Sequence, residues 1–352
     1  MIPRSRRRLR RVAVITDAVT EVEAQNWPAL ARDEGSLEPV KATLGTLGWD
    51  PVVVEFDGDP AKWLERLSHG DFELVFNLFE GLIEQPSHEY LAAAAVELLD
   101  IPMTGARSLT LALCLDKDKT NTLLRAAGMG VPDWTVVHGP GDSVCAWEQF
   151  PAIVKPVDQD SSLGIHGDCV VHDSDELRAA LGRGQRAWGR MMVQRFVAGR
   201  ELNVSIVGDQ LLPPAEIDFS GLPAALPHVV SYAAKWEDGT AEALGTVPRC
   251  PARLAPRLAR EVAAVGRRAW QAVGGTGYGR IDLRIDAAGG VYVIDVNPNA
   301  DLSPTAGLAR QAAAAGWSYR RLVARIVEDA LARAPIRASE TQQEAYRGGA
   351  HA

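Results

Sequence analysis

The chain has 352 residues, 47% of them hydrophobic, with a formal net charge of −8 and a sequence pI of about 5.5. This length predicts two or three compact modules, because single hydrophobic cores stop growing near ~250 to 300 residues. The acidic balance argues against a nucleic-acid partner, and no stretch reaches the ~20 apolar residues of a membrane span. We therefore expect a globular, cytoplasmic protein that handles small molecules.

The first module is predicted to span residues 12–113, after a basic tail at residues 1–11. Its apolar runs "VAVIT", "PVVVEF" and "FELVFNL" read as strands that alternate with helix-length segments. Such alternation predicts a parallel sheet covered on both faces by helices. The segment "SHEYLAAAAVELLD" predicts a further helix with Ser87 as its N-cap.

Two α+β modules are predicted next, at residues 114–198 and 199–335. The first combines a helix closed by Gly128, a strand that ends near Lys155 and a helix capped by Ser174. The second has two antiparallel strands in "LNVSIVGDQLLPPAEIDF", a long helix in "ARLAPRLAREVAAVGRRAWQAVG" and a final hairpin. Residues 336–352 are polar and are predicted to be a disordered tail.

Four cysteines without a C-x-x-C pair predict free thiols. They are Cys114, Cys145, Cys169 and Cys250.

The final hairpin, "YGRIDLRIDAAGGVYVIDVNPN", carries charges on one face. A four-residue turn at 287–290 places Asp282 opposite Asp295 and Arg280 opposite Asn297, since side chains repeat every two residues along a strand. The opposite face is predicted to be apolar and to pack on the long helix. It comprises Ile281, Leu283 and Ile285 against Tyr292, Ile294 and Val296.

Two carboxylates that face each other across a ladder repel unless a cation lies between them. One interpretation is a buried salt-bridge network in which Arg280 and Arg284 neutralise Asp282 and Asp295. The other is a Mg²⁺ site, because Mg²⁺ prefers one or two carboxylates together with phosphate oxygens and water, and the amide oxygen of Asn297 suits it. A calcium site would need more protein oxygens.

Six motifs in a fixed order carry a resemblance that covers roughly residues 72 to 330. They are "IPMTGARSLTLALCLDKDKTNTLLRAAGMGVP", "PAIVKPVDQDSSLGI", "VQRFVAGRELNVSIVG", "SYAAKW", "GYGRIDLRI" and "VYVIDVNPN". In these motifs the sequence resembles the ATP-grasp superfamily and, within it, the D-alanine:D-alanine ligase-like branch. The resemblance implies an N-terminal parallel-sheet α/β domain followed by two α+β domains that hold ATP between two antiparallel sheets.

The resemblance also implies a nucleotide site. Lys117 and Lys155 look like the two lysines that hold ATP phosphates. Gln194 stands where a glutamate commonly faces the adenine amino group, and its carbonyl can still accept that hydrogen bond. Adenine would meet backbone groups of Phe196 and Val197, and ribose hydroxyls would meet Glu201.

Two loops are implied to act on the phosphates. The loop "QDSSLG", with Ser161 and Ser162, resembles the family's small-residue loop that closes over the phosphates, although Asp160 replaces its first glycine. Lys235 resembles a lysine of a mobile loop that reaches the γ-phosphate.

Asp282, Asp295 and Asn297 look like the family's metal-binding trio, with aspartate at position 295 where glutamate is usual. They are implied to bind two Mg²⁺ ions, with Mn²⁺ as an alternative metal. Arg280 is expected to stabilise the charge that develops during phosphoryl transfer, assisted by Ser161 and Lys235.

The implied reaction is the ADP-forming ligation of a small-molecule carboxylate and an amine through an acyl phosphate, giving a dipeptide or a related amide. The substrate region departs from the family pattern, since Trp236 replaces a tyrosine and no Pro-Gly-Met-Thr turn follows Asn297. Candidate substrate residues are Glu21, Glu23, Glu80, Trp236, Asp301 and Ser303. The alternatives are a true D-alanine:D-alanine ligase and an ATP-binding protein without catalysis. A homodimer is a further open expectation.

Overall fold

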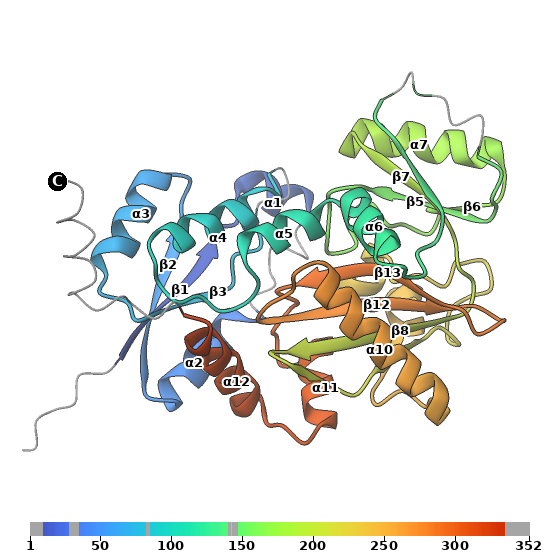
Figure 1. Cartoon of the computed structure of the whole chain (residues 1–352). Coiled ribbons are helices and arrows are strands. Elements are labelled where there is room, and N and C mark those ends of the chain that lie inside the picture. The colour runs from blue at the N-terminus through green and yellow to red at the C-terminus, as the bar shows by residue number, and fades with distance from the viewer. Residues whose placement is uncertain (1–9, 28–34, 82–84, 140–141, 143–146, 335–352) are drawn as a thin grey trace, which may run out of the picture.

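The computed structural model describes residues 10–27, 35–81, 85–139, 142 and 147–334. Three β-sheets organise this part of the chain: a parallel sheet near the N-terminus, a four-stranded antiparallel sheet and a larger antiparallel sheet (Figure 1). Arg10 and Arg11 of the predicted basic tail already belong to the first strand. The rest of that tail and the predicted disordered segment 336–352 lie outside the described residues.

The N-terminal sheet has the strand order β2-β1-β3, and all three strands are parallel. Its strands and the neighbouring helices are β1 (Arg10–Asp17), α1 (Glu21–Asn26), α2 (Leu37–Thr46), β2 (Trp49–Phe56), α3 (Pro60–His69), β3 (Leu74–Asn77), α4 (His88–Leu98) and α5 (Ser108–Leu115). Val12 and Val14 point into one hydrophobic core, whereas Ala13 and Ile15 point into another. The prediction of a parallel sheet buried on both faces is confirmed.

One of these two cores is completed by the far end of the chain. Helix α12 (Tyr319–Ala332) packs beside α2, and its Leu322 and Ile326 share a core with Val14 (Figure 1). The N-terminal module therefore depends on C-terminal residues for one side of its sheet. The predicted module boundaries remain proposals.

The antiparallel central sheet has the order β4-β7-β5-β6. Its elements are α6 (Lys117–Ala126), β4 (Trp134–Val137), β5 (Ala152–Pro156), β6 (Val170–Val171), α7 (Ser174–Trp188) and β7 (Met191–Arg195). Asp173, not Ser174, is the N-cap of α7, because its backbone is extended and its carboxylate accepts the N–H groups of Asp175 and Glu176. Ser87 is the N-cap residue of α4, but its side chain makes no capping hydrogen bond.

The larger antiparallel sheet has the order β11-β10-β8-β12-β13, and β9 also pairs with β8. Its elements are β8 (Arg200–Val207), β9 (Gln210–Leu211), β10 (Ala215–Asp218), α8 (Tyr232–Trp236), α9 (Ala241–Gly245), β11 (Val247–Arg249), α10 (Pro256–Ala272), β12 (Tyr278–Ile285), β13 (Val291–Pro298) and α11 (Gly307–Ala314). Helix α10 covers one face of this sheet, with Val262 and Trp270 packed against Leu283. The opposite face of this sheet lines the cleft described below.

The hairpin β12–β13 has the predicted register at its charged end only. Arg280 lies opposite Asn297 and Asp282 opposite Asp295. Beyond Asp282 the register shifts by one residue, so the turn has five residues (286–290) instead of four. Such a β-bulge reverses the alternation that follows it. The prediction that Tyr292 and Ile294 share the apolar face is therefore wrong. Fully buried Val293 lies there instead, opposite Leu283.

The three cysteines within the described residues carry free thiols, in agreement with the sequence prediction. Cys114 and Cys169 are buried, and burial raises the pKa of the Cys169 thiol to about 12. These thiols therefore behave as small apolar core groups. Cys145 lies outside the described residues.

Candidate active site

A cleft of about 890 Å³ opens between the central sheet and the larger sheet. Nearly all the candidate residues line it. They are Glu80, Lys117, Lys155, Ser161, Ser162, Gln194, Phe196, Val197, Glu201, Lys235, Trp236, Arg280, Asp282, Asp295, Asn297, Asp301 and Ser303. The fold thus brings together groups that lie more than 200 residues apart in sequence.

Two substrate candidates, Glu21 and Glu23, do not line the cleft. Glu21 is exposed on α1, and the buried Glu23 accepts hydrogen bonds from the backbone N–H and the hydroxyl of Thr20. Together with the reciprocal bond from the Glu23 N–H to the Thr20 hydroxyl, this forms a capping box at the start of α1. The Glu23 carboxylate therefore serves helix formation in this structure.

Asp282 is the centre of a hydrogen-bond network on the cleft side of the sheet. Arg280 donates to both of its oxygens, at 2.7 and 2.8 Å. The amides of Asn203 and Asn297 donate one bond each, at 2.7 and 2.9 Å. A carboxylate has about four lone-pair sites, so the acceptor capacity of Asp282 is filled.

Asp295, directly across the ladder, is in a different situation. Its carboxylate is half-buried, and the one hydrogen bond recorded for it within the described residues comes from the adjacent Val296 N–H. Burial raises the pKa of Asp295, while Lys117 and Lys155 act in the opposite direction. Asp295 is therefore the carboxylate of this pair with open acceptor capacity.

The salt-bridge interpretation of the hairpin is correct for one arginine and wrong for the other. Arg280 neutralises Asp282, as that interpretation requires. Arg284 pairs with Glu201 instead, because Glu201 lies directly opposite it on β8 and closes a buried ion pair of 2.6 Å. Asp295 consequently has no arginine partner among the described residues.

The two candidate phosphate lysines reach the cleft from different elements. Lys117 opens α6, and the Lys155 side chain on β5 donates to the carbonyl of Ile294 at 3.3 Å. Burial lowers the pKa of Lys155 to about 8, against a weaker opposing effect of Asp295. Burial also acts to lower the pKa of Lys117, but Asp160 and Asp295 raise it overall. The site therefore holds one firmly charged lysine and one that titrates near neutral pH.

Nucleotide affinity is expected to fall as the pH rises through about 8, because Lys155 is a charged ammonium below its pKa and a neutral amine above it. Losing one charge-assisted contact with phosphate is expected to cost about 1.5 to 3 kcal/mol, or roughly 10- to 100-fold in affinity. Calorimetric titrations with ATP one pH unit below and one above this pKa measure the effect. Lys155→Arg stays charged over this range and is expected to show a much flatter profile. Identical profiles for the two proteins would contradict the assignment.

Asp160, which replaces a family glycine, contacts one of these lysines. The Lys117 ammonium donates to the Gln159 carbonyl at 2.6 Å and to the Asp160 carboxylate at 3.2 Å. Lys117 is 8% exposed, whereas Asp160 is 47% exposed. The partly exposed Asp160 carboxylate thus forms an ion pair with Lys117, the lysine that the family resemblance assigns to phosphate binding.

Asp160→Asn is expected to tighten ATP binding by about 2- to 5-fold, the range for removing a partly exposed ion pair that competes with phosphate. Fluorescence or calorimetric titration with ATP measures this change. Asp168→Asn is the matched control, since Asp168 lies in the same connection and pairs with Arg183 outside the cleft. Weaker binding in Asp160→Asn would show that Asp160 supports the phosphate site.

The two segments predicted as phosphate loops contact each other, although the segment of Lys235 is the short helix α8 and not a loop. The Trp236 indole donates to the Ser161 carbonyl at 2.9 Å, and the Ser162 hydroxyl donates to the Val230 carbonyl at 2.9 Å. The Lys235 ammonium lies 3.5 Å from the Ser161 hydroxyl. Trp236, a departure from the family pattern, therefore ties helix α8, which carries Lys235, to the loop of Ser161.

Near the candidate adenine residues lies a buried amide nitrogen without a hydrogen-bond partner in the described part of the chain. Gln194 is 2% exposed, and its side-chain nitrogen has no hydrogen-bond partner within the described residues. It lies on β7, just before Phe196 and Val197, which also line the cleft. Buried polar groups normally have hydrogen-bond partners, so a buried amide nitrogen without one is consistent with a pocket in which a ligand supplies the acceptor.

Sequence reasoning missed two residues of the site, Asn203 and Glu89. Asn203 donates to Asp282 from β8, and period-two alternation from Glu201 could have placed it on the cleft face. Glu89, near the start of α4, also lines the cleft. Burial raises its pKa well above the usual value, and Asp160 and Glu80 add to this effect. No local pattern marks Glu89 as a cleft residue.

The donor set fits a magnesium ion. Asp295 offers open carboxylate oxygens, and Asn297 uses its amide nitrogen for Asp282 and keeps its carbonyl oxygen for a metal. Phosphate oxygens and water complete the coordination that Mg²⁺ prefers. Within the described residues no cluster of three His, Cys, Asp or Glu side chains could hold a metal ion.

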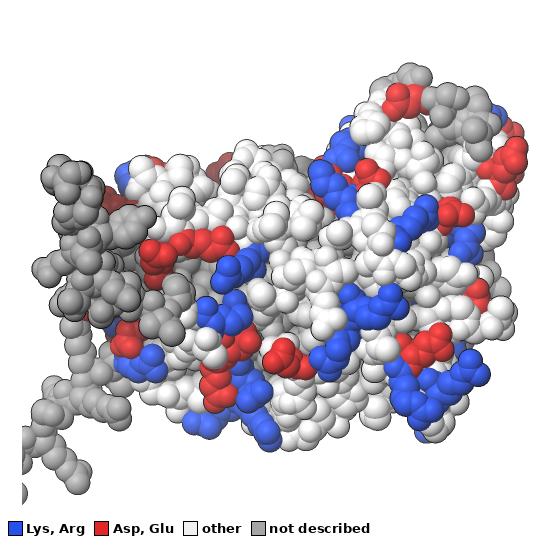
Figure 2. All heavy atoms as spheres, in the orientation of Figure 1, with Lys and Arg blue, Asp and Glu red and all other residues white. Residues whose placement is uncertain are grey.

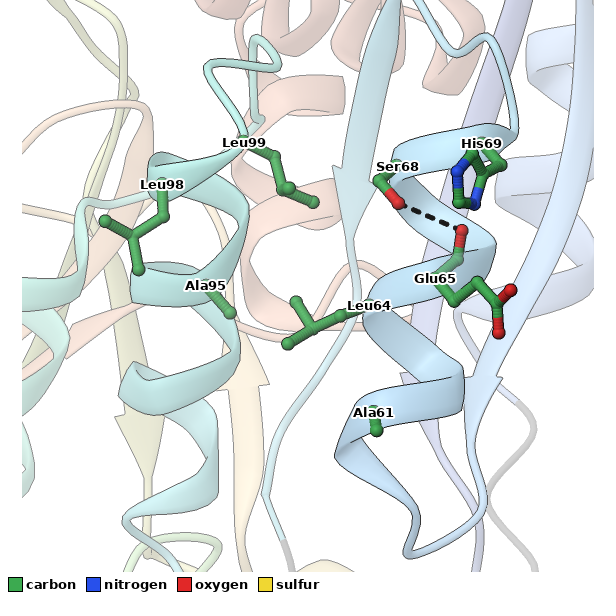
Figure 3. Close-up of a pocket in the computed structure, with 8 residues that line it drawn as sticks. All are labelled: Ala61, Leu64, Glu65, Ser68, His69, Ala95, Leu98 and Leu99. Carbon is green, nitrogen blue, oxygen red and sulfur yellow. Dashed lines mark hydrogen bonds between the residues drawn. The ribbon is translucent and has the colours of Figure 1, made fainter.

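A second groove contains none of the candidate residues. This groove of about 500 Å³ between α3 and α4 is mostly apolar, and Leu64, Leu98 and Leu99 line it (Figure 3). Figure 2 shows Lys and Arg side chains over α10 and α12 with acidic side chains among them, so this face carries both signs of charge. No helix in the described ranges has the length and apolar character needed to cross a bilayer.

Comparison with known proteins agrees with this geometry. A family model described as "D-ala D-ala ligase C-terminus" matches residues 123–328. A D-alanine–D-alanine ligase of Chromohalobacter salexigens is 33% identical over 82% of this chain and 86% of its own length. The chain belongs to the D-alanine–D-alanine ligase branch of the ATP-grasp superfamily. A second such ligase, from a Synechococcus strain, is 31% identical over 86% of this chain and 90% of its own length.

Solved structures confirm the ATP-grasp fold. The D-alanine–D-alanine ligase of Bacillus anthracis, complexed with ATP, has a TM-score of 0.72 at 22% identity and covers 92% of this chain and 98% of its own. The VanG D-Ala:D-Ser ligase of Enterococcus faecalis has a TM-score of 0.71 at 20% identity, with 92% and 99% covered. As a member of this family the chain is an ADP-forming carbon–nitrogen ligase that uses ATP and Mg²⁺. The alternative of an ATP-binding protein without catalysis is not supported.

Proposed function

We propose that this ligase joins the carboxylate of a small amino-acid-like substrate to an amine through an acyl phosphate, and that the product is a dipeptide or a related amide. The observation that carries the proposal is the meeting of Lys117, Lys155, Arg280 and Asp295 in one cleft between two antiparallel sheets. Phosphoryl transfer asks a protein mainly for positioning and for neutralisation of charge. These residues supply both.

In the proposed reaction a substrate carboxylate attacks the γ-phosphorus of ATP, and the bond to the ADP oxygen breaks. Lys117 and Lys155 hold the phosphates during this step. The amine then attacks the acyl carbon, its proton is lost, and phosphate leaves as the amide forms. Lys235 and Ser161, which line the cleft 3.5 Å apart, help to exclude water that would hydrolyse the acyl phosphate.

Arg280 is proposed to face the charge that develops in both steps. Its guanidinium is fixed by two bonds to Asp282, which Asn203 and Asn297 hold in turn. A donor that is fixed in advance needs no reorganisation when charge appears on the reacting group. Asp282 is therefore proposed to position Arg280, and it would bind a metal only by exchanging one of these four donors for the ion.

Asp295 and Asn297, with Asp282 beside them, would hold the metal. Bound Mg²⁺ supplies neutralisation of the phosphate oxygens. We propose two ions, with Mn²⁺ as a substitute, because Mn²⁺ accepts the same carboxylate and carbonyl donors.

Substrates other than two D-alanines are proposed on three observations. Glu21 and Glu23, two of the candidate substrate residues, lie outside the cleft. Trp236 is engaged with the Ser161 carbonyl. Beyond Asn297, Asp301 accepts the Ser303 N–H and places an acid where the family has its Pro-Gly-Met-Thr turn.

D-Alanyl-D-alanine synthesis is the second candidate, and the names of the relatives that are 31% and 33% identical favour it. Phosphate release with D-alanine alone, compared with pooled amino acids and simple amines, separates the candidates. Mass spectrometry of the products identifies the amide. We expect weak turnover with D-alanine alone and stronger turnover in a pool. Efficient D-alanyl-D-alanine formation at modest substrate concentration would decide for the second candidate.

A further inference from the structure

Arg284 is a buried cation of the cleft that the proposed chemistry does not use. Its side chain is 3% exposed, and it lies on β12 directly opposite Glu201 of β8. Residues paired across neighbouring strands share one face of the sheet, so the two side chains meet on the cleft side. The Arg284 Nη2 lies 2.6 Å from the Glu201 Oε2, and both residues line the cleft.

The other contacts of Arg284 also belong to the nucleotide end of the cleft. Its guanidinium donates to the Val197 carbonyl at 3.2 Å and to the His228 carbonyl. It lies over the ring of Phe196 at 4.9 Å and near the ring of Phe219 at 5.7 Å. Arg284 therefore joins β12 to two separate segments around the purine pocket.

Arg284 also controls the orientation of the Glu201 carboxylate. One Glu201 oxygen accepts from Arg284, while no hydrogen bond to the other oxygen is recorded within the described residues. Burial raises the pKa of Glu201, and Arg284 is the main influence that lowers it. The arginine thus favours an ionised carboxylate with one free oxygen, a strong acceptor for hydroxyl groups.

We propose that Arg284 is the positioning residue that holds Glu201 as the acceptor for the ribose hydroxyls of the nucleotide, and that this pair selects ribonucleotides over 2′-deoxyribonucleotides. The inference rests on the proposed function in requiring ATP in this cleft. A buried acceptor left without its donor is costly, so an analogue that lacks a hydroxyl is rejected.

The test is calorimetric titration of the full chain with ATP and with 2′-deoxyATP in the presence of Mg²⁺. The wild-type chain is expected to bind ATP about 10- to 100-fold more tightly, the value of one hydrogen bond to a charged group. Arg284→Met and Glu201→Gln are each expected to reduce the ratio to about threefold or less, and Arg284→Lys to recover part of it. Arg200→Lys is the control, because Arg200 forms an arginine–glutamate pair with Glu216 in the same sheet, and neither residue lines the cleft.

A wild-type ratio close to one overturns the inference, as does a folded Arg284→Met variant that keeps the wild-type ratio. Arg284→Met leaves Glu201 buried and unpaired and can fail to fold. In that case Glu201→Gln decides, and an unchanged ratio there overturns the inference. Binding and turnover separate the two proposals. If the chain prefers ATP to 2′-deoxyATP but forms no amide, only the proposed function is wrong. If it forms an amide but binds both nucleotides equally well, only this inference is wrong. Failure of the wild-type chain to bind either nucleotide removes both.

Discussion

Asp295→Asn is expected to lower turnover by about 10³-fold while leaving the fold intact. Asp295 is the carboxylate of the facing pair whose oxygens remain open, whereas those of Asp282 are filled by Arg280, Asn203 and Asn297. Replacing its carboxylate by an amide removes a charged ligand at the γ-phosphate, and single electrostatic contacts of this kind contribute about 10² to 10³ in rate. Stability should not fall, because the substitution relieves repulsion between two facing acids.

ADP release at saturating ATP and substrate measures the effect, and thermal unfolding of the metal-free protein checks the fold. Asp286→Asn is the matched control on the same hairpin. Its side-chain oxygen can still accept the Ala288 and Gly290 N–H groups, so turnover should stay close to that of the wild type. If the turnover of Asp295→Asn lies within tenfold of the wild-type value, the assignment of Asp295 as a metal ligand is wrong.

Arg280→Lys is expected to lower kcat by about 10²- to 10³-fold, with a much smaller change in ATP affinity. Lysine keeps the charge but loses the planar fork that makes two bonds to Asp282. Its flexible ammonium would no longer be fixed towards the reacting group. The loss should therefore fall on the chemical steps rather than on nucleotide binding.

Single-turnover measurements of ADP formation, combined with ATP titrations, separate the two effects. Arg200→Lys serves as the control here too, since it disrupts a two-bond arginine–carboxylate pair in the same sheet without reaching the cleft. A variant at position 280 that loses ATP affinity and keeps kcat would make Arg280 a binding residue instead.

The charged end of the hairpin could be predicted from sequence because strand geometry is local. Period-two alternation and a short turn are enough to place Asp282 opposite Asp295 and Arg280 opposite Asn297. The same reasoning failed beyond Asp282, because a β-bulge depends on how the strand fits its neighbours and has no reliable sequence signal. The correct pairs at the charged end were thus predicted together with an incorrect turn.

The sequence by itself determined the element types, the parallel N-terminal sheet, the charged hairpin and, through the family resemblance of six motifs, most of the candidate residues of the cleft. The first three depend on the period of apolar residues and on short-range chemistry, whereas the cleft residues were implied by the resemblance. Only the tertiary structure decided that Arg284 pairs with Glu201, that Lys117 meets Asp160, and that α12 completes the N-terminal core. The physical reason is that each of these contacts joins segments far apart in the chain. Which arginine meets which acid follows from strand order and helix packing, and no local pattern of residues encodes either.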